Sequence, residues 1–88
     1  MNYEVYYQKK AEKWILANKK SAEKFLSAFE EISQDIKGSF QIYDIVKLKG
    51  NSDFFRLRIG KYRAIFTIQN DELIILVINI DSRGGIYK

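Results

Sequence analysis

The fold of this chain is decided by a stretch past its middle, Phe54–Ile68, with the sequence FFRLRIGKYRAIFTI. Apolar and basic side chains alternate along its first part, and the turn residues Gly60 and Lys61 follow. Because successive side chains of a strand point to opposite faces, the alternation predicts a strand with one apolar and one charged face. The apolar run after the turn predicts a second strand, adjacent to the first.

Three arginines lie on this pair of predicted strands. Arg56 and Arg58 share the charged face of the first strand, about 7 Å apart, and Arg63 follows just past the turn. A guanidinium group presents a fixed fork of donors that matches phosphate oxygens. The simpler interpretation is a solvated sheet face that aids solubility. Asp53 and Asp71 are the only acids expected nearby, and exposed ion pairs contribute little.

The start of the chain predicts a strand and a helix. Tyr3–Tyr7 is a short strand whose odd-numbered residues share one face. From Lys9 the apolar residues recur at helical spacing, which predicts a short amphipathic helix with Trp14 on its buried side. Asn18 is a plausible end of this helix, because Asn tolerates the left-handed conformation.

A longer amphipathic helix follows after a very short connection. Ser21 has the character of an N-cap, and Gly38 marks the expected end of the helix. Phe25 and Phe29 lie on the apolar face and are expected in the core. Two helices with so short a connection predict an antiparallel helical hairpin.

The second half of the chain predicts the remaining strands. Residues 39–51 have no clean period and indicate an extended segment or a short edge strand ending in a turn at 49–51. Asn70 and Asp71 form a hairpin turn, and the β-branched run Leu73–Ile78 predicts a strand buried on both faces in the middle of the sheet.

The predicted order is therefore β-α-α-β-β-β. It indicates an α+β fold, with the helical hairpin packed on one face of a mainly antiparallel twisted sheet. The other face is open, and at least part of the arginine set should point to it or to its rim. With 88 residues, the chain is expected to form one domain over 1–88.

The amino-acid composition excludes several kinds of functional site. The chain contains no cysteine and no histidine, so disulfides, thiolate metal sites and the commonest general base are excluded. No cofactor or metal is suggested. The net charge is +4 with a pI of about 9.3, and no apolar run approaches the length of about 20 residues needed for a membrane span. We expect a cytoplasmic protein.

Further basic and aromatic residues are candidates for a nucleic-acid site. Lys47 and Lys49 flank Leu48 before the sheet and are either solvated loop lysines or a positive rim for a phosphodiester backbone. Arg83 and Tyr87 follow the last strand, with two glycines between them. Tyr87 either packs at the C-terminus, or stacks on a base or places its hydroxyl near a reacting oxygen.

Three segments together resemble the RelE/ParE superfamily of bacterial toxins. They are Val46–Gly50, Phe55–Phe66 and the ending Arg83–Lys88. The family pattern is a K-L-K-G loop, an R-L-R-x-G-x-Y-R hairpin, an apolar strand and a closing Arg with V-Y. The likeness covers the second half closely, whereas the first half matches only in its order of a strand and a helical hairpin.

The resemblance implies a toxin of a type II toxin–antitoxin pair, held silent by a cognate antitoxin. RelE-like members enter the ribosome and cut the mRNA, the 2′-hydroxyl attacking the adjacent phosphate to leave a cyclic phosphate. The matching catalytic positions are Arg56, Arg58, Arg63, Arg83 and Tyr87. The other basic residues expected to contact RNA are Lys47, Lys49, Lys61 and Lys88.

The chain also departs from that pattern. RelE itself has lysines where this chain has Arg56 and Arg58, and arginine stays charged rather than moving protons. Candidates for the acid and base are Tyr87, Lys61 and Lys88. The alternatives are a ParE-like inhibitor of DNA gyrase without ribonuclease activity, or an inactive member that only forms a complex with the antitoxin.

Overall fold

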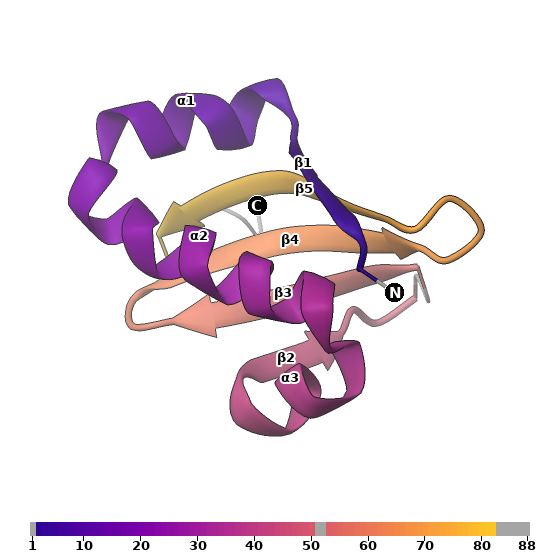
Figure 1. Cartoon of the computed structure of the whole chain (residues 1–88). Helices are drawn as coiled ribbons and strands as arrows, with labels where there is room; N and C mark the ends of the chain where they lie inside the picture. The colour runs from indigo at the N-terminus through magenta and orange to yellow at the C-terminus, as the bar shows by residue number, and fades with distance from the viewer. Residues whose placement is uncertain (1, 51–52, 83–88) are drawn as a thin grey trace.

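The computed structural model describes residues 2–50 and 53–82. This part of the chain forms one strand, then three helices, then four further strands (Figure 1). The elements are β1 (Glu4–Tyr7), α1 (Lys9–Ala17), α2 (Lys19–Gln34), α3 (Ile36–Ile42), β2 (Asp44–Lys47), β3 (Phe54–Ile59), β4 (Tyr62–Gln69) and β5 (Ile74–Ser82).

The strands form one mixed sheet in the order β1-β5-β4-β3-β2. β1 runs parallel to β5, and the other three pairs are antiparallel. The helices lie on one side of this sheet, with α2 in front of it and α3 beside β2 (Figure 1). The α+β class and the mainly antiparallel sheet are confirmed. The predicted order was incomplete, because it lacked α3. Of the two alternatives for residues 39–51, the short edge strand is confirmed by β2, which lies at one edge of the sheet.

The β3–β4 hairpin forms where the alternating sequence predicts it. Leu57 lies opposite Ala64 in the antiparallel register, and both are fully buried. Gly60 in the turn has a φ of 60°, a left-handed conformation that glycine adopts without the steric cost of a side chain. The face that carries Leu57 and Ala64 is covered by the helices, so the alternate residues of both strands face away from them.

The core between α2 and the sheet contains aromatic rings among aliphatic side chains. Phe25, Phe29 and Phe66 are fully buried, and the rings of Phe29 and Phe66 meet edge to face with centroids 5.2 Å apart. Fully burying such a side chain contributes about 1.5–3 kcal/mol relative to leaving it in water. The predicted core positions Phe25 and Phe29 are confirmed, and Trp14 packs against the core half-buried, edge to face on Phe25.

The boundary between α1 and α2 differs from the prediction. Asn18 does end α1, but its φ of −135° is not left-handed. Its side-chain Nδ2 instead donates a hydrogen bond to the carbonyl oxygen of Trp14 at 2.9 Å. The predicted N-cap Ser21 was wrong, because α2 already begins at Lys19 and the backbone carbonyl of Asn18 accepts the first helical hydrogen bond, from Ala22.

The predicted end of the second helix at Gly38 was also wrong. α2 ends at Gln34, and Gly38 lies inside α3. Asp35 has a non-helical backbone conformation, and its Oδ1 accepts a hydrogen bond from the backbone N–H of Gly38 at 3.0 Å. Asp35 is therefore the N-cap of α3, a role that its short side-chain oxygen fills well.

The last strand is longer than the predicted run Leu73–Ile78. β5 starts at Ile74 and continues to Ser82, with a register shift where Ile65 and Phe66 of β4 pair with it. It lies inside the sheet, between β1 and β4. Only its helix-side residues are fully buried, so burial on both faces was wrong. The turn at Asn70 and Asp71 is confirmed.

Candidate nucleic-acid interface

The arginines lie on the face of the sheet that points away from the helices. Arg56 and Arg58 alternate with the buried Leu57, and Arg63 precedes the buried Ala64 on β4. Side chains alternate between the faces of a strand, so all three arginines share the face opposite the core. The backbone register therefore confirms the expectation that at least part of the arginine set points to the open face or to its rim.

A row of four charged residues crosses this face near the β3–β4 turn. Asp44 of β2 pairs with Arg58 of β3, Arg58 with Arg63 of β4, and Arg63 with Asp81 of β5. Residues directly opposite each other on neighbouring strands have Cβ atoms about 4.5–5.5 Å apart. The two inner residues are both arginines, and a carboxylate residue lies at each outer position.

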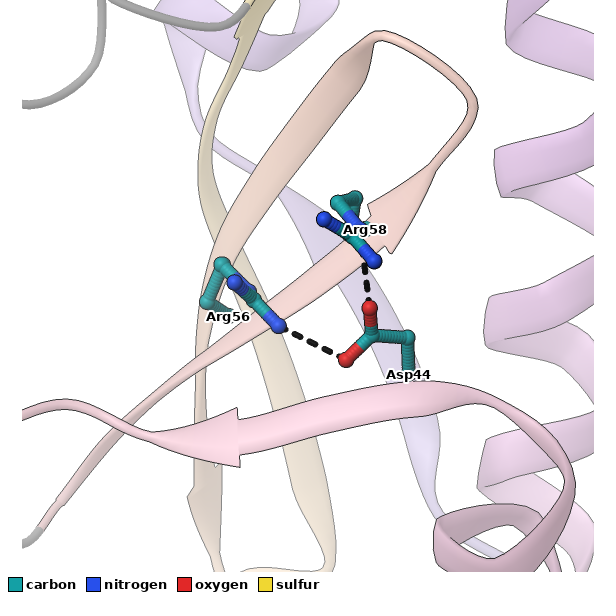
Figure 2. A network of polar contacts seen from close by, with 3 residues as sticks. All are labelled: Asp44, Arg56 and Arg58. Carbon is teal, nitrogen blue, oxygen red and sulfur yellow. Dashed lines mark hydrogen bonds and ion pairs between the residues drawn. The ribbon is translucent and has the colours of Figure 1, made fainter.

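Asp44 holds two of the arginines together (Figure 2). Its Oδ1 accepts from Nη2 of Arg56 at 2.7 Å, and its Oδ2 from Nε of Arg58 at 2.8 Å. The expectation that Asp53 and Asp71 are the only nearby acids was therefore wrong. This carboxylate orients both guanidinium groups and also cancels part of their charge.

The two bridged arginines differ in exposure. The side chain of Arg56 is 15% exposed, whereas that of Arg58 is 50% exposed. The Nε atom of Arg56 is buried and makes no hydrogen bond with the described residues. A buried donor of this kind costs stability unless a partner satisfies it. Arg58 is therefore the more accessible of the two for a ligand.

Arg58 and Arg63 line a small hollow beside the β3–β4 turn, with Gly60 and Lys61. We call it the arginine hollow. Its volume of about 240 Å³ lies below the roughly 300–1,000 Å³ of small-molecule sites. None of its described lining residues is acidic. Its size and charge suit contact with one anionic group of a longer polymer.

Not all of the lysines predicted to contact RNA lie at the arginine hollow. Lys61 lines the arginine hollow, and its Nζ also lies 5.5 Å from the centre of the Tyr62 ring. Lys47 pairs with Phe55, on the helix side of the sheet, and its Nζ lies 6.0 Å from that ring. Lys49 is exposed in the turn after β2. The structure therefore separates Lys47 from the arginines, and its contact with RNA stays a prediction.

The remaining predicted residues, Arg83, Tyr87 and Lys88, lie outside the described residues. Their roles stay predictions. The residues that sequence reasoning missed are Asp44 and Asp81. Both were invisible because they lie far from the hairpin in sequence, and only the pairing of β2 and β5 brings them into its charged row.

Ionisation is perturbed at tyrosines away from this hollow. Burial raises the pKa of Tyr7 to about 12, with Glu30 adding to the effect. A hydrogen bond from the Tyr43 hydroxyl to Glu31 raises the pKa of Tyr43 to about 12.

In the described part of the chain, no cluster of acidic side chains is arranged to hold a metal ion. Nor is any helix there long and apolar enough to span a membrane.

The fold and the site define a small α+β domain with a basic hollow on the sheet face opposite its helices. The chain matches the family described as ParE toxin of type II toxin-antitoxin system, parDE, over residues 2–87. It therefore belongs to the RelE/ParE superfamily of toxins.

Relatives and solved structures agree with this assignment. The RelE1 protein of Methanocaldococcus jannaschii is 35% identical over 66 residues, which cover 72% of this chain and 73% of that protein. The RelE–RelB complex of Pyrococcus horikoshii aligns with a TM-score of 0.76 and 25% identity, covering 97% of this chain and 99% of that one. The RelB–RelE complex of Methanococcus jannaschii aligns with a TM-score of 0.73 and 25% identity, covering 94% of this chain and 95% of that one.

Proposed function

We propose that this toxin cuts mRNA on the ribosome and that the arginine hollow binds the RNA backbone at or beside the cut. The observation that carries the proposal is the juxtaposition of Arg58 and Arg63 on neighbouring strands, with Lys61 at the same hollow. Like charges placed directly opposite destabilise a sheet. A polyanion that binds between them offsets that cost, which favours a phosphodiester ligand.

The proposed chemistry needs only the RNA and side chains of this type. The 2′-oxygen of a ribose attacks the adjacent phosphorus, and the bond from phosphorus to the 5′-oxygen breaks. The 2′-hydroxyl loses its proton and the departing 5′-oxygen gains one, leaving a cyclic phosphate and a 5′-hydroxyl end. Fixed cations beside the phosphate stabilise the charge that develops in the transition state. Arg58 and Arg63 supply this role, with Arg83 and Tyr87 as further predicted participants.

The proposal includes an antitoxin. Two of the similar structures are toxins solved with RelB, which supports a protein partner that silences this chain. A second function is inhibition of DNA gyrase without RNA cleavage, and the matching family model, that of the ParE toxin, favours it.

The deciding experiment compares RNA and DNA outcomes in the same cells. Wild-type toxin is induced in bacteria, mRNA 5′ ends are mapped, and the DNA-damage response is followed in parallel. We expect new mRNA ends and growth arrest, both lost in Arg63→Ala. The control Lys13→Ala removes one positive charge from an exposed position of α1 and should behave as wild type. Intact messages together with a DNA-damage response would instead establish the gyrase function.

A further inference from the structure

A second basic hollow lies on the other side of the β3–β4 turn, between that turn and α2. Lys20 and Lys24 of α2 line it together with Lys61, and we call it the lysine hollow. Its volume is about 290 Å³. The rest of its lining includes the polar Ser21 and the apolar or aromatic Ile59 and Tyr62.

The two basic hollows lie next to each other at the turn. The lysine hollow and the arginine hollow share Gly60 and Lys61 in their linings. Gly60 carries no side chain, so a ligand can pass close to the backbone at the crest between them. Lys61 is exposed and is placed to contact a ligand on either side.

The charge of these hollows differs from that of other hollows in the described structure. A hollow at the β4–β5 turn is lined by Asp53, Asp71 and Glu72, and one between β1 and α2 by Glu4 and Glu30. Neither has a described Lys or Arg in its lining, whereas neither basic hollow has a described Asp or Glu. Another hollow, beside α3, is lined by both Lys47 and Asp53. Among these hollows, the two at the β3–β4 turn combine basic residues with no acidic residue in their described linings.

The position of Lys20 points to binding rather than stability. It lies in the first turn of α2, after Lys19, and that turn contains no acidic residue. The helix dipole is positive at this end and disfavours a cation there. The same dipole adds to the positive potential that a phosphate meets in the lysine hollow. Exposed lysines at this end therefore weaken the helix while favouring an anionic ligand.

We propose that an RNA strand held at the arginine hollow continues over Gly60 into the lysine hollow, where Lys20 and Lys24 contact its phosphates. This inference rests on the proposed function and extends it from one phosphate to a path along the strand. Lysine suits this role, because a mobile point charge binds a backbone without demanding one geometry. The strand is either the message or ribosomal RNA, since both present the same phosphodiester backbone.

The test measures RNA binding by variants of the two hollows. The probes are a labelled trinucleotide and a labelled single-stranded RNA of about 12 nucleotides, a length within the site sizes of small single-strand binders. Both carry 2′-O-methyl groups, which prevent the 2′-oxygen from attacking. The variants are Lys20→Gln with Lys24→Gln, and Arg58→Gln with Arg63→Gln. The matched control is Lys9→Gln with Lys10→Gln, which removes two exposed lysines from the first turn of α1.

The lysine pair should bind the longer RNA more weakly and the trinucleotide as wild type. Its plot of log affinity against log salt should become shallower by about 1.4, because each phosphate contact on a single strand contributes about 0.7. The control pair should change neither the affinity for the two probes nor the salt slope. Circular dichroism and thermal unfolding confirm that each variant is folded.

The outcomes separate the two proposals. If the arginine-pair variant binds both probes more weakly while the lysine-pair variant keeps the wild-type salt slope, the proposed RNA path is wrong and the proposed function stands. If the arginine pair weakens neither probe, the proposed function fails first. Binding to vacant and to programmed ribosomes then distinguishes ribosomal RNA, which is present in both, from the message.

Discussion

Arg58 on β3 lies directly opposite Arg63 on β4, and a carboxylate residue lies on the outer side of each, Asp44 on β2 and Asp81 on β5. The sheet thus places like charges together at the centre of the row and acids at both ends. Asp44 contacts Arg58 directly at 2.8 Å. The two ion pairs of Asp44 hold the guanidinium groups of Arg56 and Arg58 in place, so a ligand must compete with Asp44 for them.

The first prediction concerns that competition. Asp44→Asn removes the negative charge beside Arg56 and Arg58 while keeping a side chain of the same shape. We expect RNA affinity to rise about threefold to tenfold, which corresponds to about 0.7–1.4 kcal/mol. The free energy of unfolding should fall by about 1 kcal/mol or less, as for other partly exposed ion pairs. Fluorescence anisotropy and urea unfolding measure the two effects.

The control for this change is Asp71→Asn, which removes an exposed acid at the β4–β5 turn. It alters net charge by the same amount as Asp44→Asn. Equal gains in RNA affinity from both variants would show that only overall charge matters, and the specific role of Asp44 would be lost.

The second prediction concerns the repulsion between Arg58 and Arg63. A double-mutant cycle with Arg58→Gln and Arg63→Gln should give a coupling free energy of about 0.2–1 kcal/mol, with the sign of a repulsion relieved. The coupling should shrink in about 1 M salt, where the screening length is about 3 Å. Thermal unfolding of the four proteins at low and high salt provides the measurement. An attractive coupling at low salt would contradict the predicted repulsion between Arg58 and Arg63.

The third prediction concerns alkaline pH. The pKa of Tyr43 is raised from 10.0 to about 12, mainly by its hydrogen bond to Glu31, and that of Tyr7 to about 12, mainly by burial. A raised tyrosine pKa means that folding favours the protonated form. The stability from these groups is therefore present below pH 10 and lost as pH rises through about 12.

The ultraviolet absorbance of phenolate checks this directly. In wild type, two tyrosines should ionise near pH 12, and Tyr7→Phe and Tyr43→Phe should each remove one of them. Glu31→Gln should move the Tyr43 ionisation back toward 10.0, because the charged acceptor that favours its proton is gone. A Tyr43 titration unchanged in Glu31→Gln would refute the assigned cause.

The sequence predicted the parts of the structure that depend on local pattern. The alternation around Leu57 gave the β3–β4 hairpin, and the helical spacing of Phe25 and Phe29 gave the core face of α2. Local pattern also placed Arg56 and Arg58 on one face of their strand. These features follow from the period of side chains along one element, which needs no knowledge of its neighbours.

The parts that failed depend on contacts between elements. Asp44 could not be assigned to the arginines, because that required the pairing of β2 with β3. The lysine hollow needs α2 packed beside the β3–β4 turn, so Lys20 and Lys24 carried no local signal. The prediction at Gly38 failed for a different reason. Glycine is typical of helix ends, but here it serves the start of the next helix.

The last prediction concerns this start, the Asp35 cap of α3. A Cβ atom built on Gly38 would lie 2.2 Å from the Asp35 carboxylate oxygen Oδ2. Any side chain at position 38 therefore displaces the cap. Asp35→Ala should lower the free energy of unfolding by about 1 kcal/mol, the usual value of such a cap. Asp35→Asn should retain most of the stability, because the Asn amide oxygen can accept the same hydrogen bond.

Gly38→Ala separates the cap from helix propensity. Alanine favours a helix over glycine by about 1 kcal/mol, and this gain should offset the lost cap in the wild-type background. In the Asp35→Ala background no cap remains to be displaced. Gly38→Ala should therefore raise the free energy of unfolding by close to the full propensity difference of about 1 kcal/mol. Urea unfolding of the four proteins gives the coupling between the two positions. Additive effects would show that Gly38 is not required for the cap, and α3 would then need another explanation for its start at Ile36.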